Sequence, residues 1–388
     1  MASIGTADDK LQWTGHGANR ILSRSIRLQP IDASVDRVVV TAMAADPRGH
    51  LLAVAGDDHV IRILHVDTMR LLHTLGDGKR DSTSGHTDWI RTMTFDPTGR
   101  RLASAGNDGR FIIWNRDRDF AIHQEINSAP ALACIRFDPF GQQIAAVGFS
   151  RNLFLIGMAA TPRQRIACDC ADLRCCAYRD DGRLLVVGGR DGHLVYFDPV
   201  SGREVADKNR FTAEHEERIR DIAFLPRSNT LLSVGEDGRL LQINSQAQRV
   251  DAEVSLTSGR LFSVIAVSPQ CAVAAGSDDT LYVVKLATAT SSARLIETLD
   301  GHRGSVPALA MIDTILFSGG FDATLRRWDV SDLLRTTDPA EEKLARRPFD
   351  LDEQIHRRVM PDTADEEPPK AMDQPSSSSE RPDIAPAF

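Results

Sequence analysis

The chain has 388 residues, of which 42% are hydrophobic, so it is long enough to bury a large core. Its net charge is −8, but residues 339–388 hold 12 acidic and 7 basic residues, which leaves the rest close to neutral. This balance excludes a global attraction to nucleic acid or to an anionic membrane. No window contains the roughly 18 consecutive apolar residues that a membrane-spanning helix requires.

The N-terminal sequence MASIGTADDKLQW has neither a basic lead nor an apolar stretch, so we expect no signal peptide. We therefore expect a cytoplasmic protein whose six cysteines are reduced thiols. Four of them lie in CDCADLRCC (168–176), a spacing that does not match the paired cysteines of structural zinc sites. We predict small buried side chains here and no metal, with Cys175 and Cys176 pointing to opposite faces of a strand.

After an N-terminal segment, residues 1–19, the first strand candidate is RILSRSIRLQ at 20–29. A repeated pattern follows it and is clearest in two segments, residues 84–115 and 300–329. Both contain Gly-His, an alternating apolar run, a strand with Ser, a tight turn with Asp, and a strand ending in Trp. The last three positions recur at the same offsets, as Ser104, Asp108 and Trp114 and as Ser318, Asp322 and Trp328.

Weaker copies of this pattern fill the rest of the chain. Their turn positions form a series with gaps of 41 to 50 residues: Asp58, Asp108, Ser150, Asp191, Asp237, Asp278 and Asp322. A period in the forties is typical of propeller blades with four strands each. The seven positions therefore predict seven blades.

The turns between these runs indicate antiparallel strands. Asp-Pro-x-Gly occurs at 46–49, 96–99 and 138–141, where Pro presets the backbone angle and Gly tolerates the exit conformation. Asp-Gly at 108–109, 191–192 and 237–238 is a strong hairpin signal. No long amphipathic helix is expected within 35–330.

These elements predict an all-β fold, a seven-bladed β-propeller of four-stranded antiparallel blades over residues 20–335. The last repeat supplies only three strands, so we expect residues 20–29 to close the ring as the outer strand of the final blade. Residues 336–388 are acidic and rich in Pro and Ser, so we expect a mostly disordered tail. That tail is interpreted either as an interaction segment or as a solvated terminus.

The repeats resemble the WD-repeat family, in which Gly-His opens a repeat and Trp-Asp closes it. Trp328-Asp329 is the one literal Trp-Asp pair, and the resemblance covers roughly residues 20–331. It implies hydrogen-bonded tetrads inside blades 2 and 7 and a tetrad without its Trp in blade 5. The residues concerned are His86, Ser104, Asp108 and Trp114, then His302, Ser318, Asp322 and Trp328, then His215, Ser233 and Asp237.

A set of Ser, His and Asp also invites a hydrolase interpretation. The set recurs at one spacing in several blades, which a single active site would not do, and the chain has no Gly-x-Ser-x-Gly motif. We therefore interpret these residues as structural. We expect a protein that is not an enzyme and needs no cofactor.

The resemblance also implies a top face whose rim carries three positions per blade. In blades 1, 2, 4, 5 and 7 these are Val39, Thr41 and Asp57; Trp89, Arg91 and Asn107; Asp172, Arg174 and Arg190; Arg218, Arg220 and Glu236; and Ser305, Pro307 and Phe321.

The arginines of blades 4 and 5, with Trp89 and Phe321, suggest a basic patch for an acidic or phosphorylated peptide. The alternative is that these arginines pair with Asp57, Asp172, Glu236 and other local acids. The leading function is thus a non-catalytic scaffold for another protein, and we include a subunit of a multiprotein complex among the expected roles. A propeller hydrolase or lactonase with a central-channel site and a nucleic-acid-binding propeller are the alternatives.

Overall fold

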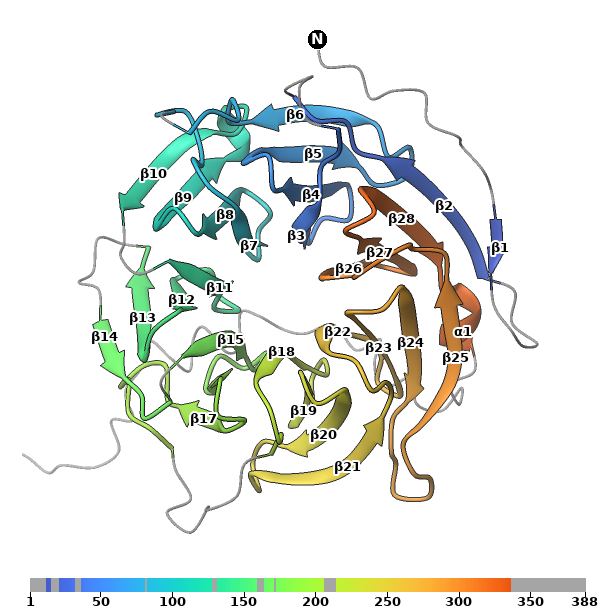
Figure 1. Ribbon diagram of the computed structural model, residues 1–388. Helices are drawn as coiled ribbons and strands as arrows, with labels where there is room; N and C mark the ends of the chain where they lie inside the picture. Colours follow the sequence, from blue (N-terminus) through green and yellow to red (C-terminus); the bar gives the residue numbers. More distant parts are fainter. Residues whose placement is uncertain are drawn as a thin grey trace, which may run out of the picture. The chain divides into compact units, whose positions relative to one another are not determined.

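The computed structural model describes residues 12–14, 21–31, 36–80, 82–127, 131–158, 164–170, 172–205 and 214–335. Within these residues, seven antiparallel sheets follow one another around a ring, which Figure 1 shows along its axis. The prediction of a seven-bladed β-propeller is confirmed. The predicted tail, residues 336–388, and most of the predicted N-terminal segment lie outside the described residues.

The first strand of each blade lies at the centre of the ring and later strands lie progressively farther out (Figure 1). Blade 1 contains β3 (Val40–Ala45), β4 (Leu51–Gly56), β5 (Ile61–His65) and β6 (Leu71–Leu75). Blade 2 contains β7 (Ile90–Phe95), β8 (Arg101–Gly106), β9 (Arg110–Asn115) and β10 (Ala121–Asn127). Blade 3 contains β11 (Leu132–Phe137), β12 (Gln143–Gly148), β13 (Asn152–Gly157) and β14 (Gln164–Ala167).

Blades 4 to 6 continue in the same order. Blade 4 contains β15 (Leu173–Tyr178), β16 (Leu185–Gly189) and β17 (Leu194–Phe197), and a single bridge joins Phe197 to Glu204. Residues 206–213, which follow this bridge in the chain, lie outside the described residues. Blade 5 contains β18 (Ile219–Phe224), β19 (Thr230–Gly235), β20 (Arg239–Asn244) and β21 (Arg249–Ser255). Blade 6 contains β22 (Leu261–Ser268), β23 (Cys271–Gly276), β24 (Thr280–Lys285) and β25 (Arg294–Asp300).

Blade 7 combines the two ends of the described chain. Its inner strands are β26 (Ala308–Ile312), β27 (Ile315–Gly319) and β28 (Thr324–Asp329), and its outer strands are β2 (Ile21–Arg27) and β1 (Gln12–Thr14). The antiparallel register of β2 places Ser23 opposite Trp328. The predicted closure of the ring by an N-terminal strand is therefore confirmed.

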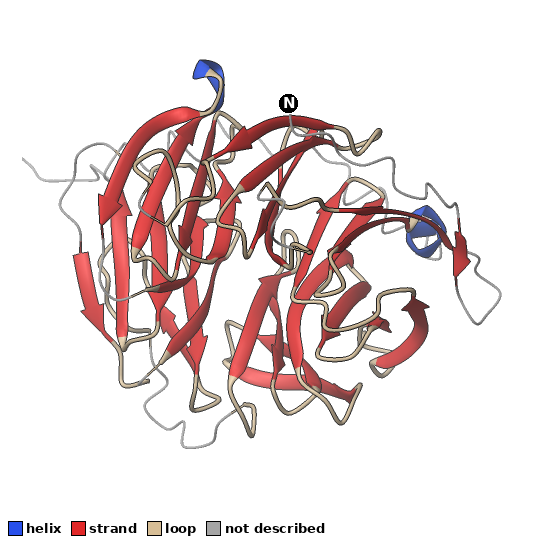
Figure 2. Cartoon of the chain, turned by 45° about the horizontal axis from the view of Figure 1, so that its top comes forward, coloured by secondary structure: helices blue, strands red, loops and turns tan. Residues whose placement is uncertain are grey.

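Helical structure is scarce in the described residues. It consists of one 3-10 turn, η1 (Arg116–Arg118), and the short helix α1 (Ser331–Arg335), and Figure 2 shows how little these add to the strands. No helix in this part of the chain has the length and apolar character to cross a membrane. The hairpin turns depend on glycine: Gly238 has a φ of +72°, and a Cβ there would meet the Thr257 carbonyl oxygen at 2.0 Å.

The core lies between blades. In the described residues each pair of neighbouring blades shares one buried apolar cluster. Between blades 3 and 4, for example, Leu153 and Leu155 of β13 pack with Leu185 and Val187 of β16. Middle strands such as β4 are buried along their whole length, whereas outer strands such as β21 are largely exposed. A blade therefore cannot bury its apolar faces alone, and closure of the ring is what completes the core.

Candidate functional site

The polar residues that the repeats place inside blades 2 and 7 form closed hydrogen-bond chains. In blade 2, His86 Nε2 lies 2.8 Å from Ser104 Oγ, which also accepts from Trp114 Nε1 at 2.9 Å. His86 Nδ1 lies 2.9 Å from Asp108 Oδ2. Because these side chains are almost fully buried, each polar atom needs such a partner.

Blade 7 repeats this chain and blade 5 shortens it. Ser318 Oγ lies 2.7 Å from His302 Nε2 and accepts from Trp328 Nε1 at 2.8 Å, while His302 Nδ1 lies 3.2 Å from Asp322. In blade 5 the hydrogen-bond chain runs from Asp237 through His215 and ends at Ser233. Ile243 stands where the Trp would be and has no indole N–H to donate to Ser233.

The turn carboxylates of these chains are held in their charged form. Burial alone would raise the pKa of Asp237, but the hydrogen bond and charge of His215 and two backbone N–H groups lower the pKa below its usual range. The same balance lowers the pKa of Asp108 and of Asp322, with His86 and His302 as the partners. The Ser, His and Asp side chains of each set thus lie inside their blade and hydrogen-bond to one another.

A channel of about 820 Å³ runs through the centre of the ring, lined by the first strands of all seven blades. The face where those strands begin is called the top face here. At its top end lie residues that we call the channel mouth: Trp89, Arg91, Phe149, Arg174, Arg220, Arg260, Phe262 and Phe321.

Three arginines at the channel mouth stack on aromatic rings. The Arg91 guanidinium carbon lies 5.0 Å from the centre of the Trp89 ring, within one blade. The other two pairs cross between neighbouring blades: Arg174 lies 4.0 Å from the Phe149 ring, and Arg220 lies 5.0 Å from the Phe262 ring. Cation–π contacts of this length orient the guanidinium groups while leaving their N–H edges available.

The three charges influence one another across the channel. Burial lowers the pKa of Arg91, and the positive charges of Arg220 and Arg174 lower the pKa further. Burial also lowers the pKa of Arg220, and repulsion from Arg174 adds to that effect although Glu236 opposes it. The channel mouth is therefore a place where positive charge from three blades is concentrated.

Two carboxylates beside the channel mouth compensate part of this charge. Asp172 Oδ2 accepts from Arg174 at 2.7 Å and lies 3.7 Å from Arg218. Glu236 contacts Arg218 at 3.3 Å, Arg220 at 3.1 Å and Arg260 at 3.8 Å. The rim arginines thus pair in part with local acids, as the alternative interpretation expected, yet four arginines share these two carboxylates.

Arg91 and Asp57 lie outside these ion pairs. The Arg91 Nε donates to Asn107 Oδ1 at 2.9 Å, and no carboxylate of the described residues lies within ion-pair distance of Arg91. Asp57 accepts instead from the backbone N–H of Val39 at 2.8 Å. Three buried atoms near the shared carboxylates, Asp172 Oδ1, Arg174 Nε and Arg218 Nε, have no hydrogen-bond partner among the described residues.

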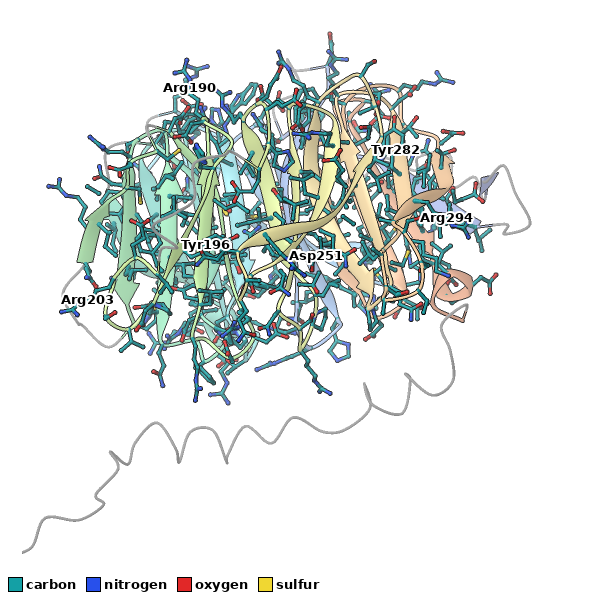
Figure 3. The ribbon with its side chains drawn as sticks, turned by 90° about the horizontal axis from the view of Figure 1, so that it is seen from below. Arg190, Tyr196, Arg203, Asp251, Tyr282 and Arg294 are labelled. Carbon is teal, nitrogen blue, oxygen red and sulfur yellow. The ribbon has the colours of Figure 1, made fainter. Side chains whose placement is uncertain are left out.

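The remaining predicted rim residues divide by position. Trp89 is 36% exposed and Phe321 is 40% exposed, and both line the channel mouth. Arg190 is exposed and its backbone N–H donates to the Asp172 carbonyl, but it does not line the channel. Figure 3 shows Arg190 on one face of the ring and Arg203 on the opposite one.

Phe149, Arg260 and Phe262 were not among the predicted rim residues. They belong to blades 3 and 6, where the repeat is most degenerate and no rim positions were derived. The offsets used for the other blades find them: Arg260 and Phe262 flank the first residue of β22, as Arg218 and Arg220 flank that of β18. The sequence therefore contained the positions of these three residues, but the weak repeat in blades 3 and 6 made the strand starts hard to recognise.

The bottom end of the channel differs from the channel mouth. Its lining includes Asp96, Asp138 and Asp180, which follow the first strands of blades 2, 3 and 4. All three carboxylates accept hydrogen bonds from backbone N–H groups. The N–H of Arg101 donates to Asp96, those of Gln142 and Gln143 donate to Asp138, and that of Arg227 donates to Asp180. In the described residues no group of three or more His, Cys, Asp or Glu side chains is placed to hold a metal ion.

A family model for the "WD domain, G-beta repeat" matches this chain at residues 32–64, 78–115, 161–198, 208–243 and 293–329. The five matches each end in a different blade of the ring, and the two blades without a match are blades 3 and 6. The chain belongs to the WD-repeat β-propeller family. The two unmatched repeats also form four-stranded blades of the same ring, although neither has the complete His, Ser, Asp and Trp set.

Parts of this chain are similar to other known proteins. It is 30% identical over 159 residues to "Periodic tryptophan protein 2 homolog" of Dictyostelium discoideum, covering 40% of this chain and 17% of that protein. It is 28% identical over 196 residues to "Nuclear distribution protein PAC1-2" of Uncinocarpus reesii, covering 50% and 35%. It is 24% identical over 208 residues to "Nuclear distribution protein PAC1" of Arthroderma benhamiae, covering 54% and 38%. The matches span well under half the length of each of these relatives.

Proposed function

We propose that this WD-repeat propeller is a non-catalytic scaffold that binds an acidic or phosphorylated segment of a partner protein at the channel mouth. Arg91, Arg174 and Arg220 contact the anionic group, and the aromatic side chains contact the apolar residues beside it. The observation that carries the proposal is the set of three arginines from three blades, each stacked on an aromatic ring around one cavity.

The electrostatics support an anionic partner. In the described residues two carboxylates, Asp172 and Glu236, are shared by four arginines, and Arg91 donates to the neutral Asn107: Arg174, Arg218, Arg220 and Arg260. A guanidinium with a free N–H edge suits carboxylate and phosphate oxygens, and Trp and Arg are the residues most enriched at interface hot spots. Partly buried arginines that already repel one another gain most from an added anion, because screening by water is weaker there.

Family membership supports a binding role over a catalytic one. The Ser, His and Asp sets are hydrogen-bonded within their own blades, so none of these sets offers a nucleophile and base to a substrate in the channel. Membership of a larger complex is part of the same proposal, as is a cytoplasmic location.

The test compares two triple variants of the full chain. The first, Arg91→Ala with Arg174→Ala and Arg220→Ala, removes the three stacked arginines. The matched control, Arg190→Ala with Arg203→Ala and Arg294→Ala, removes the same charge from three exposed positions that do not line the channel; Figure 3 labels all three. Both are checked by circular dichroism and thermal melting, and each is titrated with peptide arrays in which one position carries Ser, Glu or phosphoserine.

We expect the wild type and the control to bind the Glu or phosphoserine peptides, and the first variant to lose at least tenfold in affinity. Equal binding by the two folded variants would contradict the proposal. If instead single-stranded or duplex nucleic acid binds with a steep dependence on salt and peptides do not bind, the nucleic-acid alternative is correct.

A further inference from the structure

Two thiols from neighbouring blades meet beside the channel. Cys134 of β11 and Cys176 of β15 are 42 residues apart in sequence, and their Sγ atoms are 3.6 Å apart. Cys176 is fully buried, and Cys134 is 5% exposed and lines the channel. Both pack in the apolar cluster between blades 3 and 4. Neither thiol contributes to the channel mouth.

The surroundings make the two thiols unequal. The hydrogen bond from the Cys176 thiol lowers the pKa of Cys134; burial opposes this shift, and the positive charge of Arg136 adds to it. The same hydrogen bond, together with burial, raises the pKa of Cys176 well above its usual range. Arg136 also lines the channel, where it lies 3.9 Å from Asp221. Because Cys134 lines the channel while Cys176 is fully buried behind it, Cys134 is the thiol that a small oxidant in the channel reaches first, and Cys176 is its partner.

The other cysteines lack this arrangement. Cys175 follows the opposite face of β15 and packs between blades 4 and 5, as the sequence predicted, with its Sγ directed at the Gly188 carbonyl. Burial raises the pKa of Cys168 and of Cys271 to about 12. In the described residues Cys134 and Cys176 are the cysteine pair whose sulfur atoms are in contact.

We propose that Cys134 and Cys176 are a peroxide-reactive site that closes into a reversible disulfide between blades 3 and 4. The Cys134 thiol loses its proton, the thiolate attacks one oxygen of hydrogen peroxide, the O–O bond breaks, and the leaving hydroxide takes up the proton that Cys134 released to become water. The Cys176 sulfur then attacks the resulting sulfenic acid, an S–S bond forms, and the S–O bond breaks. The departing hydroxide leaves with the Cys176 proton as a second water, so two thiols are oxidised and one peroxide is reduced.

Access and distance fit this chemistry. Hydrogen peroxide is small compared with the channel of about 820 Å³, and Cys134 and Arg136 both line it. For the bond to form, the sulfur atoms must approach from 3.6 Å to about 2.05 Å, so the proposal requires rotation of the two side chains. The bond would tie β11 to β15 at the same boundary that the Arg174 and Phe149 contact spans at the channel mouth. The proposal does not require the partner-binding function.

The experiment treats reduced full-length protein with hydrogen peroxide, blocks the remaining thiols by alkylation, and maps the tryptic peptides by mass spectrometry. Cys134 falls in the tryptic peptide 119–136, whereas Cys175 and Cys176 share the peptide 175–179. The Cys175→Ser variant is therefore the reference protein, because it makes the assignment unique. Cys134→Ser and Cys176→Ser each remove one member of the pair, and Cys271→Ser is the matched control for a buried thiol elsewhere.

We expect the peptides 119–136 and 175–179 to be cross-linked in the Cys175→Ser and Cys271→Ser proteins and to separate on reduction. The Cys176→Ser variant should instead accumulate a sulfenic acid at Cys134 that dimedone traps, and Cys134→Ser should show neither product. An Arg136→Gln change should slow the first step several-fold while leaving the fold intact by circular dichroism. Oxidation that reaches Cys168 or Cys271 as fast as Cys134, or loss of the cross-link in Cys175→Ser, would overturn the proposal.

Discussion

Polar side chains of this propeller are arranged in two contrasting ways, in the tetrads inside the blades and at the channel mouth. In the tetrads of blades 2 and 7, every side chain is bonded to the next one and the chain ends on a turn carboxylate. At the channel mouth, four arginines share Asp172 and Glu236, and buried atoms of Asp172, Arg174 and Arg218 have no partner in the described residues.

The two arrangements differ in whether polar groups remain available for a ligand. A buried network with every partner present stabilises one conformation and has no capacity left for a ligand. Buried polar atoms without hydrogen-bond partners lower the stability of the unbound protein, and a ligand that supplies those partners restores it. The bottom end of the channel resembles the tetrads, because its carboxylates already accept hydrogen bonds from backbone N–H groups: Asp96, Asp138 and Asp180.

The largest effect on stability should come from breaking a complete tetrad. Ser318→Ala removes the partner of both Trp328 Nε1 and His302 Nε2, and we expect a loss of about 2–4 kcal/mol in the free energy of unfolding. Ser233→Ala leaves only His215 Nε2 without its partner, because Ile243 stands where the indole would be, so about half of that loss is expected. Urea denaturation of the two variants measures the difference, and equal losses would show that the indole bond adds nothing.

A smaller effect should appear on acidification. Because the pKa of Asp322 in the folded chain lies below the ordinary carboxyl value of about 3.9, its contribution is complete above that pH and is lost as the pH falls below it. We expect the free energy of unfolding of the wild type to fall by on the order of 1–2 kcal/mol more than that of Asp322→Asn between pH 6 and pH 3. Parallel curves for the two proteins would mean that the carboxylate is not held in its charged form.

The tetrads were predictable because they repeat. Ser and Asp recur at one offset in blades 2, 5 and 7, and the fold places each set in the same position. The pairing of Asp172 with Arg174 was also within reach, since residues two apart on a strand share a face. What the sequence left open was which of the two interpretations of the arginines holds, because that depends on distances between blades.

The contacts between blades were beyond the repeat pattern. Arg174 stacks on Phe149 and Arg220 on Phe262 across blade boundaries, and the contact depends on how neighbouring blades pack and on the chosen rotamers. The same holds for the thiol pair, where a cysteine of CDCADLRCC meets Cys134 of the preceding blade. A pattern along one repeat gives the face on which a residue lies, but not its neighbour in the next repeat.

The smallest effect on stability should come from the channel mouth itself. Arg174→Ala removes one ion pair with Asp172 and one cation–π contact with Phe149, while Arg218 stays near Asp172, so we expect a loss below about 1 kcal/mol in the free energy of unfolding. The same change should weaken binding of the acidic or phosphorylated peptide strongly, whereas Arg190→Ala should alter neither quantity. Urea denaturation and peptide titration of the two variants make the comparison. A large loss of stability with unchanged binding would show that Arg174 is a structural residue like those of the tetrads. The contrast between complete and incomplete hydrogen-bond networks would then not hold for Arg174.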